Sequence, residues 1–329
     1  MYQKKNSFLA IDPLKVSIPE VHKLLLGGIA PRPIALVSTI SEDGINNLSP
    51  FSFFNAFGAN PPTIVFSPAN RGRDGSTKDT LENLKIIKEC VVQAVTYDIV
   101  QQVSLASTEY DSDIDEFIKS GLTPIDSLKI KPKRVAESPF QMECVVKQII
   151  PLGDKNASGN LVICEVVQFH VDEKIMQDGI LEPNLIKLVG RNSANYYTKA
   201  FDSSIFEIEK PITTKGIGID QLPDYIKHSD NLSGNELGQL GNIESLPTED
   251  SLNKFIDTYK KIQFDADEIA GLLKHSDYHS LFSAGIALSK DEPATSRRII
   301  EISAKKALEQ NDTQFAIKAL LSLKLLSTK

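Results

Sequence analysis

The sequence predicts a mostly antiparallel β-barrel with short inserted helices, followed by an all-α helical array. Residues 1 to about 205 carry short β-branched runs separated by Gly, Pro, Asn and Asp, the pattern of strands and turns. Beyond a polar, Gly/Asn/Ser-rich stretch, apolar residues recur at helical spacing. A chain of 329 residues is long enough for two domains. We therefore expect a barrel at 1–209, a linker at 210–250 and a helical domain at 251–329.

Strands are expected wherever apolar, β-branched runs are bounded by turn residues. The runs lie at 34–40, 63–67, 90–96, 140–150 and 160–173. The turn sequences SEDG (41–44) and GDKNASG (153–159) are of the kind that joins neighbouring antiparallel strands. Helical spacing interrupts the strands at 77–89 and 112–120. Strands of this sort favour a closed or nearly closed barrel.

The C-terminal part is expected to be an array of antiparallel helices. Apolar stripes at helical spacing occupy 252–262, 266–274, 276–289, 294–310 and 313–327, with breaks at KHSD, KDEP and QND. Such stripes are more often plain core than partner grooves, although a protein partner for these helices is left open.

Composition excludes several classes of function. The formal net charge of −7 argues against nucleic acid as the main partner, because phosphate binding needs a basic surface. We expect no membrane span, since no apolar run is long enough. Cys90, Cys144 and Cys164 lie far apart in strand-like segments, without zinc spacing. This spacing predicts no metal site. The odd number of cysteines argues against a disulfide framework and favours buried thiols in a reducing compartment. Together with an N-terminus unlike a signal peptide, this predicts a cytoplasmic protein.

The segment NLSPFSFFNAF (47–57) combines phenylalanines with short hydrogen-bonding side chains. Ser49, Ser52 and Asn55 recur three apart, and Pro50 releases backbone groups from sheet pairing. Such a corner offers donors to a polar ligand while the rings wall off an apolar one. The alternative is that the phenylalanines simply fill the barrel.

The segment GSTKDTLEN (75–83) predicts a helix start with Ser76 or Thr77 as its cap. Lys78, Asp79 and Thr80 would lie in the first turn. Free backbone N–H groups beside a lysine and a hydroxyl form an anion site. An ordinary capped surface helix is the alternative. Together with the aromatic corner, this helix start matches the needs of a nucleotide cofactor with a large planar ring.

Several ordered motifs resemble the flavin reductase-like family, which comprises FMN-binding proteins of the split-barrel type. The motifs are PRPIALVSTISEDGINNLSPFSFFN (31–55), NPPTIVFSP (60–68), KDTLEN (78–83), EVVQFHVDE (165–173) and LVGRNSANYY (188–197). The likeness spans about 20 to 200 and does not reach the helical tail. It implies an FMN-binding split barrel.

The resemblance also implies roles for individual residues. The flavin would be lined by Thr39, Asn47, Ser49, Pro50, Ser52, Phe53 and Asn55. Ser67 would hold the cofactor at its strand end, and Lys78, Asp79 and Thr80 would address the phosphate or ribityl chain. The inserted segment NRGRDGS (70–76) departs from the family pattern, and Arg71 or Arg73 is an alternative source of positive charge.

Three further residues follow from the same likeness. The family places a histidine near the end of the strand that holds His170, where it would approach nicotinamide or substrate as the catalytic residue. A structural histidine is the alternative. Arg191 and Tyr196 would reach the cofactor across a subunit contact, or simply start a helix.

The resemblance predicts an NAD(P)H-dependent flavin oxidoreductase, with FMN reduced by hydride transfer to its N5 atom and NADH or NADPH as the transient donor. No GxGxxG motif is present, so the nicotinamide would need no Rossmann domain. Family members are usually homodimers with the cofactor near the subunit boundary. A non-enzymatic FMN-binding electron carrier, resembling flavoredoxin, is the alternative. A third hypothesis makes the helical tail the working part, as an interaction scaffold.

Overall fold

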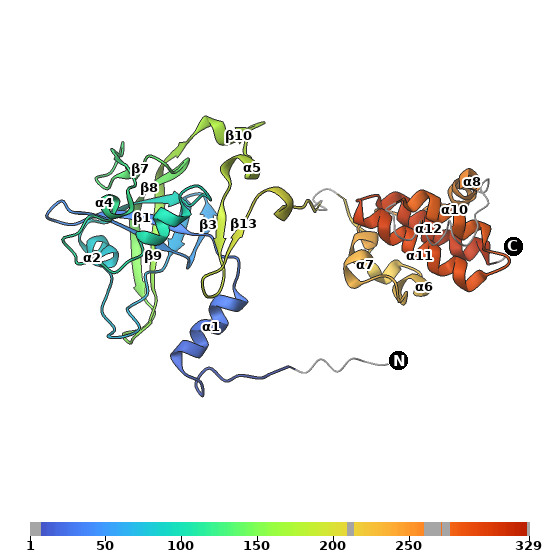
Figure 1. Ribbon diagram of the computed structural model, residues 1–329, viewed down its shortest axis with the longest axis horizontal. Helices are drawn as coiled ribbons and strands as arrows, with labels where there is room; N and C mark the ends of the chain where they lie inside the picture. The colour runs from blue at the N-terminus through green and yellow to red at the C-terminus, as the bar shows by residue number, and fades with distance from the viewer. Residues whose placement is uncertain (1–7, 209–213, 260–270, 272–276, 328–329) are drawn as a thin grey trace. The chain divides into compact units, whose positions relative to one another are not determined.

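The structure is a computed structural model that describes residues 8–208, 214–259, 271 and 277–327. The chain divides into two compact units, Met1–Glu207 and Ile208–Lys329 (Figure 1). Each unit has its own hydrophobic core and is described by itself.

The first unit is built on a seven-stranded antiparallel sheet with the order β2-β1-β5-β8-β9-β4-β3. Its strands are β1 (Ala35–Ile40), β2 (Asn46–Phe51), β3 (Phe54–Ala59), β4 (Pro62–Phe66), β5 (Glu89–Ala94), β8 (Phe140–Pro151) and β9 (Asn160–Val171). Short two-stranded pairs are β6 (Pro124–Ile125) with β7 (Arg134–Val135), β10 (Met176–Gln177) with β11 (Ile180–Leu181), and β12 (Val189–Arg191) with β13 (Tyr197–Lys199). The helices are α1 (Ile18–Gly28), α2 (Asp79–Ile86), α3 (Val100–Leu105), α4 (Glu116–Ser120) and α5 (Pro183–Ile186).

Chain connectivity forces this sheet to curl. Strands β2 and β3 lie at opposite ends of the strand order, yet only Ser52 and Phe53 connect them. Two connecting residues span at most about 11 Å between the flanking Cα atoms. The two edges of the sheet therefore meet at this corner, although they are not paired with each other in the described sheet. The mostly antiparallel barrel with short inserted helices, predicted from the sequence, is confirmed.

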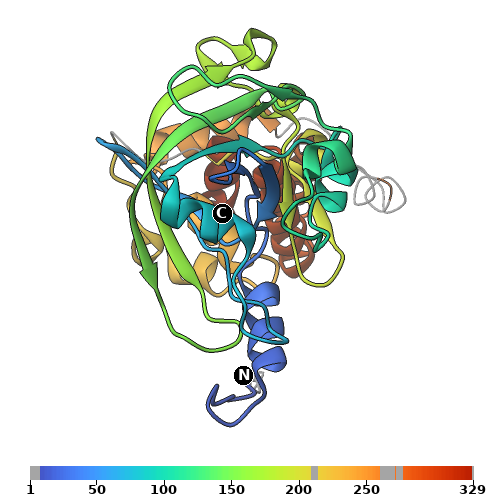
Figure 2. The same cartoon turned by 90° about the vertical axis from the view of Figure 1, so that its left-hand side faces the viewer.

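The two faces of the curled sheet bury different clusters. Val37 and Val92 lie on the inner face, where Leu81 and Leu84 of α2 pack against them. Leu36 of the same strand β1 points the other way, into a cluster that α3 and α4 complete. This alternation follows from the two-residue period of a strand. Figure 2 shows α2 lying across the inside of the curled sheet.

The second unit is helical. Its helices are α6 (Asp224–Lys227), α7 (Gly234–Gly241), α8 (Glu249–Tyr259), α10 (Tyr278–Ala287), α11 (Pro293–Glu309) and α12 (Thr313–Leu326). They share one hydrophobic core. The apolar stripe predicted at 266–274 lies, apart from residue 271, outside the described residues. No helix among the residues that the structure describes is both long and apolar enough for a membrane span.

The expectation of an irregular linker at 210–250 is wrong for most of that segment. Leu222, Ile226 and Leu240 are buried in the core of the helical unit. Helix α7 begins with a capping box, in which the Ser233 backbone N–H and hydroxyl both donate to Glu236. The polar composition of the segment hid these few apolar residues, which pack because α11 and α12 supply the rest of their surroundings.

Candidate functional site

A buried polar network joins the end of the β1–β2 hairpin to α2. Thr39 and Asn47 are paired in register, and the Thr39 hydroxyl donates to Asn47 Oδ1 at 3.1 Å. The Thr80 hydroxyl donates to the same oxygen at 2.7 Å. Thr39 also accepts from Asn83 Nδ2 at 3.1 Å. All three predicted flavin contacts in this network are buried and already satisfied by one another.

The acidic member of the network is Glu116 of α4. Its carboxylate accepts from Asn47 Nδ2 at 3.1 Å and from the backbone N–H of Leu48 at 3.0 Å. Burial raises the pKa of the Glu116 carboxyl, against the effect of these hydrogen bonds. The carboxylate fixes the orientation of the Asn47 amide, and so leaves Asn47 Oδ1 free to accept from the two threonines.

Helix α2 begins at Asp79, with Lys78 at the N-cap, so the predicted caps are wrong. The Lys78 side chain makes no capping hydrogen bond, and the Thr77 hydroxyl donates instead to Glu82. The Lys78 ammonium lies 5.3 Å from the ring centre of Phe51. Its burial lowers the pKa of Lys78. The start of α2 therefore presents uncapped N–H groups beside a partly desolvated cation.

Arg71 lies on the loop that leads to this helix start. One of its terminal nitrogens, Nη1, donates to Ser76 Oγ at 3.3 Å and to the backbone oxygen of Thr77. Its Nε is buried and has no hydrogen-bond partner among the described residues. The nearest acid is Glu109, 3.5 Å from Arg71 Nε and 3.0 Å from Arg73 Nη1. A buried donor with no hydrogen bond and only this long ion-pair contact is one to which an anionic ligand can add a hydrogen bond.

The predicted ring-binding residues lie along the corner between β2 and β3. Ser49 and Pro50 of β2 are half-buried, while Phe53 retains 36% exposure. Ser52 accepts from Arg32 Nε at 3.3 Å, and the Asn55 side chain accepts from the next backbone N–H. Because Ser49 pairs with Val37 in register, it shares the inner face with the Thr39–Asn47 pair.

Ser67 has a structural partner, since its hydroxyl accepts from the backbone N–H of Asn160 at 3.1 Å. Asn160 is buried and also donates to Pro68 O and Asn70 Oδ1. This asparagine ties the loop that carries Arg71 to the start of β9. Sequence reasoning missed it, although its place after the turn GDKNASG was visible.

Arg191 and Tyr196 belong to the β12–β13 hairpin rather than to a helix. The Arg191 guanidinium lies 4.6 Å from the ring centre of Tyr197, and the Tyr196 side chain is 72% exposed. The hairpin reaches the β2–β3 corner through Arg32, whose backbone pairs with that of Arg191. Arg32 was also missed, although it stands between two prolines in the motif PRP.

Arg32 is the anchor of the corner. It is buried and donates to the backbone oxygens of Leu26 and Ile29, both at 2.7 Å, and to that of Asn192 at 3.1 Å. Burial lowers the pKa of Arg32, as does the nearby Arg191 charge. One guanidinium thus links α1, Ser52 and the β12–β13 hairpin.

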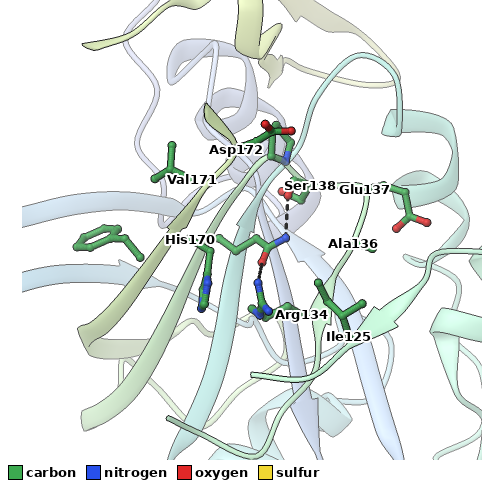
Figure 3. Close-up of a pocket in the computed structure, with 11 residues that line it drawn as sticks. Ile125, Arg134, Ala136, Glu137, Ser138, His170, Val171 and Asp172 are labelled. Carbon is green, nitrogen blue, oxygen red and sulfur yellow. Dashed lines mark hydrogen bonds between the residues drawn. The ribbon is translucent and has the colours of Figure 1, made fainter. Parts of the chain in front are cut away.

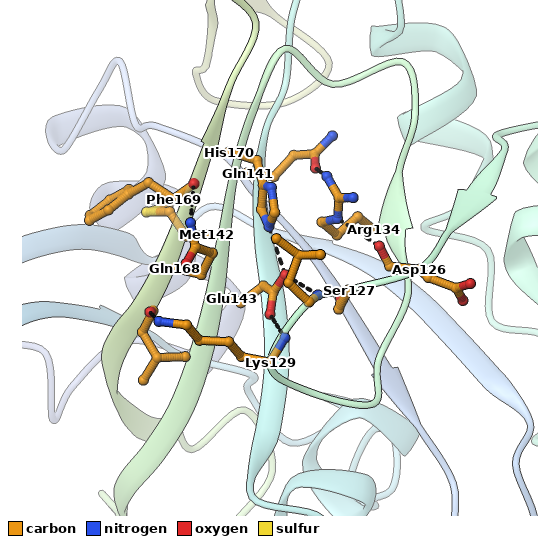
Figure 4. A network of polar contacts seen from close by, with 12 residues as sticks. Asp126, Ser127, Lys129, Arg134, Gln141, Met142, Glu143, Gln168, Phe169 and His170 are labelled. Carbon is orange, nitrogen blue, oxygen red and sulfur yellow. Dashed lines mark hydrogen bonds and ion pairs between the residues drawn. The ribbon is translucent and has the colours of Figure 1, made fainter.

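His170 lies on the other face of the sheet. It pairs with Gln141, and the neighbouring Met142 faces the inner cluster. His170 lines a separate cavity of about 500 Å³ (Figure 3). Its Nε2 lies 2.6 Å from Oε1 of Glu143, which is fully buried (Figure 4). The structure therefore does not bring His170 together with the other predicted residues within one chain.

The fold is a curled antiparallel sheet, and its site is a cationic corner at the start of an internal helix. These two features together define the class of protein. Residues 27–194 match a family model described as flavin reductase like domain. The chain belongs to this family. The match lies within the first unit, and the helical unit lies outside it.

Two relatives match this chain over more than half of its length. An uncharacterized protein of Aquifex aeolicus is 35% identical over 182 residues, which are 55% of this chain and 90% of that protein. The uncharacterized protein BH2278 of Halalkalibacterium halodurans is 34% identical over 205 residues, which are 62% of this chain and 97% of that protein.

Solved structures include nitrilotriacetate monooxygenase component B from Bacillus cereus. It has 33% identity and a TM-score of 0.58, over 62% of this chain and all of that chain. The 2-nitrobenzoate 2-nitroreductase NbaA from Pseudomonas fluorescens has 25% identity and a TM-score of 0.54, over 63% of this chain and all of that chain.

The residues present fit a flavin mononucleotide. Its phosphate needs cations and N–H donors. Arg71, whose Nε makes no hydrogen bond among the described residues, the desolvated Lys78 and the uncapped start of α2 supply both. Its ring needs a partly apolar wall with short polar groups, which Phe53 and Ser49 provide at the corner.

Proposed function

We propose that this protein is an FMN-binding oxidoreductase that uses NADH or NADPH as a transient electron donor. The observation that carries the proposal is the buried Nε of Arg71 beside the start of α2, which among the described residues has no hydrogen-bond partner and only a 3.5 Å ion-pair contact with Glu109. A buried guanidinium donor is costly unless an anion completes its hydrogen bonds. The phosphate of FMN is an anion of the right kind, and family membership independently supports a flavin.

Each part of the corner has a distinct task in this proposal. Arg71 and Lys78 hold the phosphate, with the backbone N–H groups of Asp79 and Thr80. Ser49, Pro50, Ser52, Phe53 and Asn55 line the ring. Thr39, Asn47 and the Thr80 hydroxyl support the corner from behind, because they are buried and bonded to each other.

When bound, FMN supplies a ring that accepts hydride at N5. The chain's own residues bind and orient the two reactants. The half-exposed Phe53 ring shields one side of the corner from water, which favours close stacking of two planar rings. Backbone and side-chain donors of the corner stabilise negative charge on the flavin ring.

We further propose that the protein is a homodimer. The exposed apolar side chains near the corner include Phe57 at 69%, Leu24 at 50% and Leu25 at 44%. Helix α1 buries none of its residues within the chain, and β3 is an edge strand. A second copy would cover this apolar surface and would bring Arg191 and Tyr196 toward the neighbouring site. A reducing, cytoplasmic setting fits the three free thiols.

An absorbance spectrum of the purified protein with added FMN tests the proposal. We expect a flavin band that co-purifies or titrates to one site per chain, and that bleaches when NADH or NADPH is added. R71Q and K78Q should each weaken FMN binding at least about tenfold, because each removes a charge-assisted contact to the phosphate. K174Q is the matched control, because it removes an exposed lysine that is distant in sequence from Arg71 and Lys78.

The outcomes separate the competing functions. Flavin binding without bleaching by either nicotinamide would favour the electron carrier, which keeps the same site. Equal affinity for FMN in R71Q, K78Q and K174Q would overturn the assignment of the phosphate site.

A further inference from the structure

Glu109 places a carboxylate beside Arg71 and Lys78, the two cations that the proposed function assigns to the flavin phosphate. Its Oε1 lies 3.5 Å from Arg71 Nε, and its Oε2 lies 3.0 Å from Arg73 Nη1. Burial lowers the pKa of Lys78, and the negative charge of Glu109 opposes this effect. Glu109 therefore interacts with three cations beside the start of α2, which lacks a side-chain cap.

The contacts of Glu109 with the two arginines are weak. Arg71 Nε makes no hydrogen bond among the described residues, so its 3.5 Å contact with Glu109 is an ion pair only. The side chains of Arg73 and Glu109 are 68% and 45% exposed, and exposed ion pairs add little to stability. Arg73 also has a second acid, Asp74, at 3.1 Å. An anion that makes better contacts can therefore take the place of the Glu109 carboxylate.

Glu109 lies on the loop 107–114, which is mostly exposed and is fixed at both ends. Before this loop, Ala106 is buried in the cluster that α3 and α4 complete. After it, Asp115 caps α4 and accepts from Asn46 Nδ2 at 2.9 Å. The described hydrogen bonds of residues 107–114 lie within the loop or join it to α3. The loop can therefore move away from α2 while the sheet and both helices stay in place.

We propose that Glu109 occupies the place of the flavin phosphate in the ligand-free protein. A bound phosphate displaces Glu109 together with its loop, an inference that rests on the proposed function for the identity of this ligand as FMN. A phosphate carries about two negative charges and accepts several hydrogen bonds. It can accept from Arg71 Nε and from the backbone N–H groups at the start of α2. Two anions at one position repel each other, so Glu109 leaves when the phosphate arrives.

The displacement distinguishes ligands by their phosphate. Riboflavin has the flavin ring without the phosphate, so Glu109 should keep its contacts with Arg71 and Arg73 when riboflavin binds. Inorganic phosphate has the charge without the ring, so it should release the loop 107–114 by itself. The position of this loop therefore indicates whether the phosphate site is occupied.

Millisecond hydrogen exchange of the full-length protein, followed in peptides that cover 107–114, tests this displacement. The amides of Thr108, Tyr110 and Ile114 are the probes, because each donates a local hydrogen bond. Saturating FMN, and separately inorganic phosphate, should raise their exchange at least about twofold, since a displaced loop opens more often. Riboflavin should leave their exchange unchanged. A ligand that merely covered the loop would slow the exchange instead.

Two variants of the loop decide whether Glu109 is responsible. E109Q should raise the exchange of the ligand-free protein to the level that FMN gives in the unsubstituted protein, and FMN should add little to it. D111N is the matched control, because it removes another exposed acid from the same loop, and it should behave as the unsubstituted protein does. Equal exchange in ligand-free E109Q and D111N would overturn the proposal.

The outcomes separate this displacement from the proposed function. If FMN binds but slows or does not change the exchange of 107–114, the displacement is wrong while the flavin site stands. If FMN does not bind but inorganic phosphate raises the exchange, the displacement stands while the flavin function is wrong. If neither ligand raises the exchange, the displacement is wrong in either case.

Discussion

Replacing Thr80 by valine tests whether the buried network supports the corner or contacts the flavin. The change keeps the shape of the side chain and removes one hydroxyl, which donates to Asn47 Oδ1 at 2.7 Å. That oxygen keeps its second donor, Thr39, so no buried acceptor is orphaned. The free energy of unfolding should therefore fall by the contribution of one ordinary hydrogen bond, about 1 kcal/mol. Thr39→Val should cost more, about 1–3 kcal/mol, because it also leaves the Asn83 amide without its acceptor.

The measurement is urea unfolding of the full chain, followed by hydrogen exchange in peptides from β1 and β2. It reports on the stability of the first unit. Thr77→Val is the matched control, since its hydroxyl bonds to Glu82, whose side chain is 50% exposed. We expect a loss of stability in the order T39V, then T80V, then T77V, with similar FMN affinity in all three. If T80V were as stable as T77V yet lost FMN affinity tenfold or more, the Thr80 hydroxyl would face the ligand and the supporting role would be refuted.

Three further predictions follow from the contacts of the first unit. Glu109→Gln should tighten FMN binding about two- to fivefold, because it removes an acid that competes with phosphate for Arg71, whereas riboflavin affinity in the same titration should not change. Burial raises the pKa of Glu116 above its usual 4.5. The favourable contribution of Glu116 to the free energy of unfolding is therefore complete below pH 4.5, and it is lost as pH rises through the pKa that Glu116 has in the folded protein. E116Q should remove that slope from the stability measured against pH, and an unchanged slope would contradict the assignment. A chain ending at Glu207 should bind FMN with unchanged affinity, as spectral titration would show, because the corner lies entirely within the first unit.

The barrel could be predicted from the sequence because its signals are local. β8 and β9 are long β-branched runs on either side of a turn rich in Gly, Asn and Asp, and they pair as that pattern predicts. The start of α2 was misplaced by one or two residues because a serine and a threonine precede Lys78. Local preference allowed either as a cap, but Thr77 bonds to Glu82 instead.

The face of the sheet to which His170 points could not be predicted from the sequence. Which side chains of a strand point inward depends on how the strand pairs with its neighbours in the folded protein. The β8–β9 pair shifts register twice, between Glu143 and Cys144 and between Val146 and Gln148. Each bulge changes which side chains face inward, and the sequence does not mark its position. The likeness to a family motif located the histidine on the correct strand but could not give the face to which it points.

The inner and outer faces of the sheet therefore carry different kinds of charged groups. On the inner face and its corner, Arg71 and Lys78 lie at the start of α2, and the buried Arg71 Nε makes no hydrogen bond among the described residues, only an ion-pair contact with Glu109. On the outer face, His170 contacts the buried Glu143 beside a cavity that the exposed acids Glu137 and Asp172 also line. A dinucleotide donor carries several negative charges, so the acidic outer cavity is the poorer place for it. Under the proposed function, we therefore expect the nicotinamide to approach from the side of the β2–β3 corner. His170 lies on the outer face, so under the proposed function we expect H170Q to leave the rate of flavin bleaching by NADH or NADPH unchanged, and a bleaching rate at least about tenfold lower would contradict this placement.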